Sequence, residues 1–194
     1  MNNKKPKYNM KVIVFLLVLI SGTTLISNVL NFLPEVQKDF DVQKVISAVD
    51  DKSVGYLIYT ESLRYDLDPY EMAAIAYKES NLKRFAHCKR PRGGYDRGFF
   101  QVYSGTAEWL FEDVLKEYGN AELVRNNPKV MYESYLNIHA ACGYMRWILD
   151  HPKTTGAKRT PFSGYGYYNS GKKNFEPNMD DAVQFHEIHF GEGE

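Results

Sequence analysis

The spacing of apolar residues in the second half of the chain restricts the fold more than any other feature. From Met131 to Leu149 the apolar side chains recur in steps of four and three residues, which is the repeat of one face of an α-helix. Strands would need a period of two, so this segment predicts a long core-facing helix that begins at Asn127-Pro128 and ends near Asp150. The stripe consists of Met131, Tyr135, Ile138, Cys142, Met145 and Leu149.

An earlier helix is predicted to place a carboxylate on an apolar face. Asp68 is a natural N-cap, Pro69 suits the first helical position, and Glu71 would complete a capping box. Glu79 then lies within about 60° of apolar side chains on the helical wheel. Because burial disfavours the charged form of a carboxylic acid, this face predicts a raised pKa for Glu79 and a role as general acid. A helix-end glutamate that faces solvent is the alternative.

A third helix is expected to start at Ser104 or Thr106 and to end at Gly119-Asn120. Alternating patterns typical of strands are scarce along the sequence. With 44% hydrophobic and 25% charged residues, the composition is that of a folded globular protein. We therefore predict a mainly α-helical domain.

The N-terminus has the pattern of an export signal. Lys4, Lys5, Lys7 and Lys11 precede residues 12–33, an uncharged run of 22 residues. At about 1.5 Å per residue a helix of this length reaches roughly 33 Å, enough to cross a bilayer core with its lysines in the cytoplasm. A signal peptide is the alternative, but no Ala-x-Ala cleavage site is evident, so an uncleaved anchor is favoured. Both interpretations export the remainder of the chain.

The exported part divides into a connector and a domain. Residues 34–53 have a polar, charge-mixed composition typical of a connector, so the folded domain is expected to span residues 54–194. An oxidising compartment would permit a disulfide between Cys88 and Cys142. Two independent thiols are the favoured alternative, because Cys142 falls on the apolar stripe, where a free thiol packs well.

Several classes of function are excluded by composition and spacing. The 24 basic and 24 acidic side chains cancel, so a generic nucleic-acid binder is not expected. His186 and His189 lack the spacing that puts two zinc-binding histidines on one helix face. The sequence contains no phosphate-binding glycine loop and no Gly-x-Ser-x-Gly elbow. We therefore expect neither a metal nor a cofactor.

Three short motifs follow one another in an informative order. They are Glu-Ser-Asn at 79–81, Asp-Arg-Gly-Phe-Phe-Gln-Val at 96–102 and Tyr-Tyr-Asn-Ser-Gly at 167–171. The set resembles the catalytic domain of the soluble lytic transglycosylases, lysozyme-like enzymes of glycoside hydrolase family 23 that cleave peptidoglycan. In that family a Glu-Ser pair, a Ser-x-Gly-Leu-Met-Gln turn and an Ala-Tyr-Asn-Ala-Gly segment occur in the same order. Residues 137–145 look like a further motif of the family.

The resemblance implies a role for each matching position. Glu79 would be the single catalytic acid/base, and Ser80 would help to orient it. Gln101 would contact the sugar near the scissile bond, the Tyr168 hydroxyl would lie near the glutamate, and Asn169 would shape the groove. Ordinary glycosidases use two carboxylates, whereas a lytic transglycosylase uses the C6 hydroxyl of muramic acid as its nucleophile. The implied reaction cleaves the β-1,4 bond between N-acetylmuramic acid and N-acetylglucosamine, forms 1,6-anhydromuramic ends and consumes no water.

Some positions depart from the family pattern. Asp96 stands where serine is usual. If Asp96 positioned water, the enzyme would be a hydrolytic muramidase. A local turn hydrogen bond is the favoured role for Asp96. Phe99-Phe100 replace the usual leucine-methionine pair, and packing in the core is favoured over stacking on a sugar. The basic loop 87–94 either attracts carboxylates of the substrate or is a solvated surface.

The expected fold is thus a lysozyme-like helical domain preceded by an N-terminal hydrophobic helix. Its expected partners are peptidoglycan glycan strands, the inner membrane and the components of a secretion or phage assembly. The expected location is the periplasm or cell envelope, with an anchor at residues 12–33. A non-catalytic peptidoglycan-binding assembly subunit is the alternative from another class of protein, because it would keep the groove and tolerate the loss of Glu79.

Overall fold

The computed structural model describes residues 41–91 and 93–191. Contacts divide the chain into Met1–Asp41 and Val42–Glu194, and the features below belong to the second unit. The anchor predicted at residues 12–33 lies outside the described residues. Among the helices of the described part, none has the length and apolar character needed to span a membrane.

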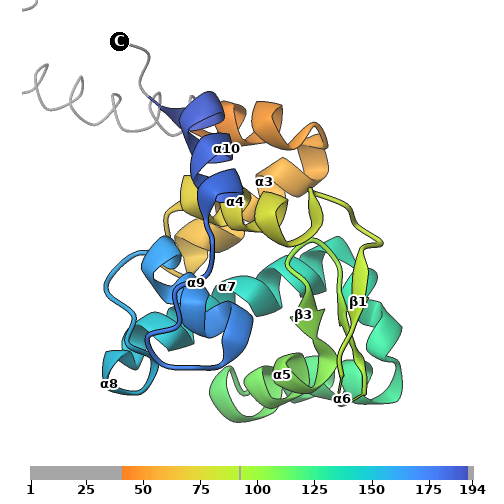
Figure 1. The fold of residues 1–194 in the computed structure, drawn as a ribbon. Coiled ribbons are helices and arrows are strands. Elements are labelled where there is room, and N and C mark those ends of the chain that lie inside the picture. The colour runs from red at the N-terminus through yellow and green to blue at the C-terminus, as the bar shows by residue number, and fades with distance from the viewer. Residues whose placement is uncertain (1–40, 92, 192–194) are drawn as a thin grey trace, which may run out of the picture. The chain divides into compact units, whose positions relative to one another are not determined.

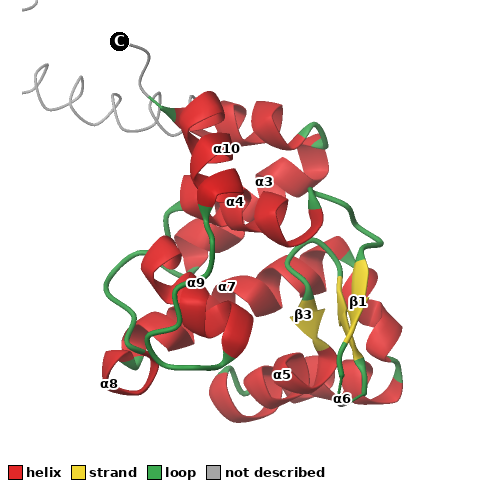
Figure 2. Ribbon diagram, in the orientation of Figure 1, coloured by secondary structure: helices red, strands yellow, loops and turns green. Residues whose placement is uncertain are grey.

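Helices make up most of this unit, which confirms the mainly α-helical prediction (Figures 1 and 2). Residues 42–49, in the predicted connector, are helical and bury Val45, Ala48 and Val49 in the core. The remaining elements are α3 (Lys52–Arg64), α4 (Pro69–Ser80), α5 (Ser104–Trp109), the π-helical turn η1 (Leu110–Val114), α6 (Tyr118–Asn126), the 3-10 turn η2 (Pro128–Tyr132), α7 (Ser134–Asp150), α8 (Pro152–Thr155), α9 (Pro161–Ser170) and α10 (Asp180–Phe190).

A small antiparallel sheet, which the sequence did not predict, lies at one side of the helices (Figure 2). Its strands follow chain order as β1 (His87–Lys89), β2 (Tyr95–Arg97) and β3 (Val102–Tyr103). Asp96 stands at its centre, opposite Cys88 on β1 and Tyr103 on β3. Strands of two or three residues are too short to show an alternating pattern in the sequence.

The central helix α7 carries most of the predicted stripe into the core (Figure 1). Its start was predicted too early, because Glu133 is extended (ψ 124°) and separates η2 from α7. Tyr135 was also predicted to be buried, but it is 43% exposed and stacks on the ring of His139 with centroids 5.3 Å apart. The five other residues of the stripe are buried: Met131, Ile138, Cys142, Met145 and Leu149.

The helix predicted to end at Gly119-Asn120 instead ends near Leu115. The backbone N–H of Leu115 donates to the carbonyl of Leu110 at 2.8 Å, which widens the last turn into a π-helix. Lys116 then adopts a left-handed conformation (φ 59°), and α6 starts afresh with Gly119-Asn120 inside it.

This break brings Glu117 to a buried histidine. His139 is fully buried, with Nδ1 2.7 Å from Glu61 and Nε2 3.0 Å from Glu117. The imidazole of His139 therefore links α3, α7 and the residue before α6 through its contacts with two carboxyl groups.

The ends of α4 are only partly as predicted. The Asp68 carboxylate caps the helix by accepting the N–H of Tyr70 at 2.8 Å and that of Glu71 at 3.1 Å. The predicted capping box does not form, because the Glu71 carboxylate accepts the N–H of Phe162 at 2.7 Å. That bond ties the start of α4 to the start of α9, and α4 ends at Ser80 where Asn81 turns left-handed (φ 53°).

Candidate active site

Glu79 is the penultimate residue of α4 and its carboxyl is partly buried. The Tyr165 hydroxyl, from α9, donates to Glu79 Oε1 at 2.7 Å. Burial is the largest influence on this carboxyl and raises its pKa, in agreement with the apolar face predicted from the sequence. Hydrogen bonds from Tyr165 and Asn169 act in the opposite direction, the charge of Asp96 raises the pKa further, and that of Lys78 lowers it. The net effect is a raised pKa, as a proton donor near neutral pH requires.

A buried amide fixes the turn at residues 98–101. Asn137, on α7, is fully buried, and its Oδ1 accepts the N–H of Phe100 at 3.0 Å. Its Nδ2 donates to the carbonyls of Arg97 at 2.8 Å and Met131 at 3.1 Å. The oxygen and the nitrogen of the Asn137 amide therefore both have partners within the protein, and these bonds hold the turn against α7.

Gln101 ends this turn in a left-handed conformation (φ 46°), and its Nε2 donates to the carbonyl of Gly98 at 2.8 Å. Glycine is needed at position 98, where φ is +77° and a Cβ atom would collide with the side chain of Asn137. The turn thus presents the side chain of Gln101 in a fixed orientation.

Two adjoining cavities meet at Gln101 and form a groove. The sheet cavity, of about 710 Å³, lies between the sheet, α7 and α9, and Tyr168, Asn169 and Asp96 line it. The helix-end cavity, of about 660 Å³, contains Glu79 and lies between the end of α4 and β1. Since Gln101 lines both, the acid stands beside the junction of the two cavities.

Asp96 is held by an ion pair across the β1–β2 hairpin rather than by a bond within its own turn. Arg90 Nε donates to Asp96 Oδ1 at 2.7 Å, and the guanidinium lies 4.3 Å from the centre of the Tyr103 ring. Burial raises the pKa of Asp96, while the charge and hydrogen bond of Arg90 lower it. One cation of the predicted basic loop is therefore used inside the groove.

The structure assigns different contacts to Tyr165 and Tyr168, two of the three tyrosines of α9. The Tyr168 hydroxyl donates to the carbonyl of Phe100 at 2.9 Å and so braces the turn, whereas Tyr165 bonds to the glutamate. The sequence reasoning missed Tyr165. Residues three apart on a helix share a face, so the helical repeat could have pointed to Tyr165 once Tyr168 was chosen.

The other predicted residues lie near Glu79 in different ways. Asn169 lines the sheet cavity and hydrogen-bonds toward the Glu79 carboxyl. The Ser80 hydroxyl donates to the carbonyl of Ala76 at 3.1 Å and accepts the N–H of Lys83 at 3.2 Å. These two bonds satisfy backbone groups at the C-terminal end of α4, next to Glu79.

Close packing of α9 brings its tyrosines to the acid. A Cβ atom at Gly164 would lie 2.8 Å from Sδ of Met145, so α9 packs closely on α7 at this glycine. Phe99 and Phe100 are 4% and 0% exposed, which confirms that the aromatic pair packs in the core.

Cys88 is exposed and Cys142 is buried, and both are free thiols. In the part of the chain described by the structure, no group of three or more His, Cys, Asp or Glu side chains could hold a metal ion.

Comparison with known proteins places this site in a family. The family model described as Transglycosylase SLT domain matches residues 56–187, which is more than half of the chain and includes every residue of the groove named above. Searches of curated proteins and of solved structures gave no match. The chain therefore belongs to the transglycosylase SLT domain family, the lytic transglycosylase family that its three motifs resemble.

Proposed function

We propose that this protein is a peptidoglycan lytic transglycosylase that uses Glu79 as its only acid/base. Its target is the β-1,4 bond between N-acetylmuramic acid and N-acetylglucosamine. The observation that carries the proposal is the environment of the Glu79 carboxyl. This carboxyl is partly buried, its pKa is raised, and it accepts a hydrogen bond from the Tyr165 hydroxyl. It also lines the helix-end cavity of the groove. Membership of the family supports a lytic transglycosylase-type function on peptidoglycan.

The proposed reaction needs one carboxyl in two protonation states. Protonated Glu79 donates its proton to the glycosidic oxygen while the bond from that oxygen to C1 breaks. The resulting carboxylate accepts the proton of the C6 hydroxyl as the C6 oxygen bonds to C1, which closes the 1,6-anhydro ring. Between these steps the Tyr165 hydroxyl stabilises the carboxylate through a charge-assisted hydrogen bond. We assign the amides of Gln101 and Asn169, which line the groove, to contacts with the sugars.

The decisive variant is Glu79→Gln, which keeps the side-chain size and removes the proton. Release of soluble muropeptides from purified sacculi should fall to background, because no other carboxyl occupies this position. Glu122→Gln, an exposed position on α6, is the matched control and should keep the release rate of the unsubstituted protein. Unchanged release by Glu79→Gln would remove Glu79 from the mechanism. A pulldown of that variant on insoluble peptidoglycan distinguishes lost turnover from lost binding and so tests the assembly-subunit alternative.

A hydrolytic muramidase is the second candidate, because Asp96 lies close enough to influence the pKa of Glu79 and lines the same groove. Mass spectrometry of the products separates the two reactions: a lyase leaves anhydro ends and a hydrolase leaves reducing ends. If Asp96 positions water, Asp96→Asn should abolish reducing-end products. If the protein is the proposed lyase, the Asp96→Asn variant should still form anhydro ends.

We also propose that the domain acts in the cell envelope, anchored by residues 12–33 in the cytoplasmic membrane. The support is the lysine-flanked, uncharged run of the sequence. An alkaline phosphatase fused after residue 40 should be active in intact cells, and an inactive fusion would contradict export.

A further inference from the structure

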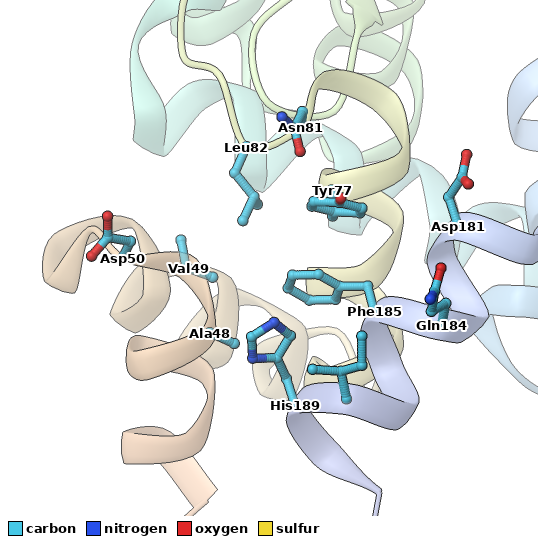
Figure 3. Close-up of a pocket in the computed structure, with 11 residues that line it drawn as sticks. Ala48, Val49, Asp50, Tyr77, Asn81, Leu82, Asp181, Gln184, Phe185 and His189 are labelled. Atoms are coloured by element: carbon cyan, nitrogen blue, oxygen red, sulfur yellow. The ribbon is translucent and has the colours of Figure 1, made fainter.

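A third cavity, the terminal-helix cavity, lies between residues 48–50, the end of α4 and α10 (Figure 3). It has a volume of about 430 Å³. Its walls are aliphatic at Ala48, Val49 and Leu82, and Ile188 is 69% exposed beside them.

This cavity adjoins the proposed groove. Tyr77, Asn81 and Asp181 line both the terminal-helix cavity and the helix-end cavity that contains Glu79. The Asp181 carboxylate accepts from the Lys78 ammonium at 2.8 Å, so the shared rim carries a neutralised ion pair. A branch attached to a glycan strand in the groove can therefore extend into the cavity.

The floor of the cavity is poorly suited to a further sugar ring. Tyr77 and Phe185 stack on each other with centroids 4.5 Å apart and an angle of 19°, and Figure 3 shows the two rings face to face. His189 also packs against Phe185, with centroids 4.5 Å apart. Sugars bind aromatic residues through open ring faces, and this stacking occupies such faces. The aliphatic walls suit small apolar groups instead.

The polar groups of the cavity match a peptide. Within the described residues, the side-chain amides of Asn81 and Gln184 have no hydrogen-bond partner, so their donors and acceptors are available to peptide groups. The carboxylate of Asp50 is exposed and, over the same residues, has no ion-pair partner. Figure 3 shows it on the segment opposite α10 with its carboxylate at the outer edge of the cavity, where it can accept an ammonium group from the end of a bound chain.

We propose that the terminal-helix cavity binds the peptide stem of a muramoyl residue whose glycan strand occupies the groove. Asn81 and Gln184 bind amides of the stem, the aliphatic walls take its alanine methyl groups, and Asp50 pairs with the free side-chain ammonium of its diamino acid. A stem cross-linked through that amine has lost this charge, so the site favours uncross-linked strands. The inference rests on the proposed function, because the strand in the groove delivers the stem.

Binding of an isolated stem peptide to the full chain tests the site without turnover. Two peptides are titrated calorimetrically, one with a free side-chain amine and one with that amine acetylated. The free amine should improve Kd by about two- to fivefold, the range of an exposed ion pair. Asp50→Asn should abolish this difference. Asp113→Asn changes an exposed aspartate on η1 that has no ion-pair partner in the described part of the chain, and it should keep the difference. Equal affinity of the original protein for both peptides would overturn the role of Asp50.

A filling variant tests the cavity itself. Gln184→Trp places a large ring at an exposed position of the cavity and should weaken peptide binding at least about tenfold. Val183→Trp, on the neighbouring position of α10 outside the cavity, should bind as the original protein does. If Gln184→Trp leaves the peptide affinity unchanged, or weakens a stem-free glycan instead, the cavity does not bind the stem.

Turnover separates this inference from the proposed function. KM should be lower for strands with stems than for strands stripped by an amidase, and Asp50→Asn should raise KM only for the former. Cleavage with equal KM values for both strands would contradict the stem-binding inference and would still support the proposed function. Peptide binding without cleavage of either strand would support the stem-binding site and contradict the proposed function.

Discussion

The bond between Tyr165 and Glu79 gives the most informative single substitution. The hydroxyl donates to the carboxyl at 2.7 Å and favours its ionised form. Tyr165→Phe keeps the ring but removes the donor, so the carboxylate becomes less stable and the pKa of Glu79 rises further. Because Glu79 acts first as an acid, its active form then persists to higher pH.

The size of the effect follows from the hydrogen bond. A bond to a charged group contributes about 1.5–3 kcal/mol, and the lower end applies because the carboxyl is only partly buried. At about 1.4 kcal/mol per pH unit, the basic limb of the pH profile of kcat/KM should move upward by about one unit. The maximum rate should fall by up to about tenfold, since the same bond stabilises the carboxylate formed in the first step.

The assay is the rate of muropeptide release from sacculi across a pH series, with thermal unfolding measured in parallel. Tyr168→Phe is the matched control, because its hydroxyl binds the Phe100 carbonyl rather than the acid. That variant should leave the basic limb in place even where the rate falls. A Tyr165→Phe profile with an unmoved basic limb, or one shifted to lower pH, would show that Tyr165 does not set the proton affinity of Glu79.

Two further predictions concern the buried polar groups. Asn137→Ala removes three hydrogen bonds that hold the 98–101 turn and should lower the free energy of unfolding by about 2–4 kcal/mol, measured by urea denaturation; a change below about 1 kcal/mol would mean that the turn is held by other contacts. His139→Leu removes the hydrogen-bond partner of two carboxyl groups and should lower the free energy of unfolding by about 2–4 kcal/mol, seen as a lower denaturation midpoint; retention of the midpoint would contradict a stabilising role for the cluster.

The sequence predicted the fold where local patterns are strong. The N-cap at Asp68 and the core stripe of α7 depend on residues close together in the chain, and both are present. The breaks were missed because tertiary partners cause them. Glu133 is extended so that the Met131 carbonyl can accept from Asn137, and Glu71 bonds to Phe162, some 90 residues away, instead of closing its own helix.

The site was predictable to the extent that a motif represents it. Glu79, Gln101 and Asn169, which the motifs select, lie around one groove, and their roles there stay a prediction. The tyrosine that holds the acid lies one helical turn before the one chosen, because a motif aligns letters and does not show which hydroxyl reaches the carboxyl. The terminal-helix cavity was not predictable at all, since its lining comes from three distant segments and follows from their packing.

A single carboxyl that must give and then take a proton needs an intermediate basicity, and distant parts of this fold act on it in opposite directions. Burial against the apolar face of α4 makes the acid weaker, and the nearby charge of Asp96 adds to this effect. The hydroxyl of Tyr165 counters them by donating to Glu79 Oε1 at 2.7 Å, and it comes from α9, far along the chain from α4. The α9 helix therefore takes part in the chemistry through the contact that favours the ionised form of the acid once its proton has been given up.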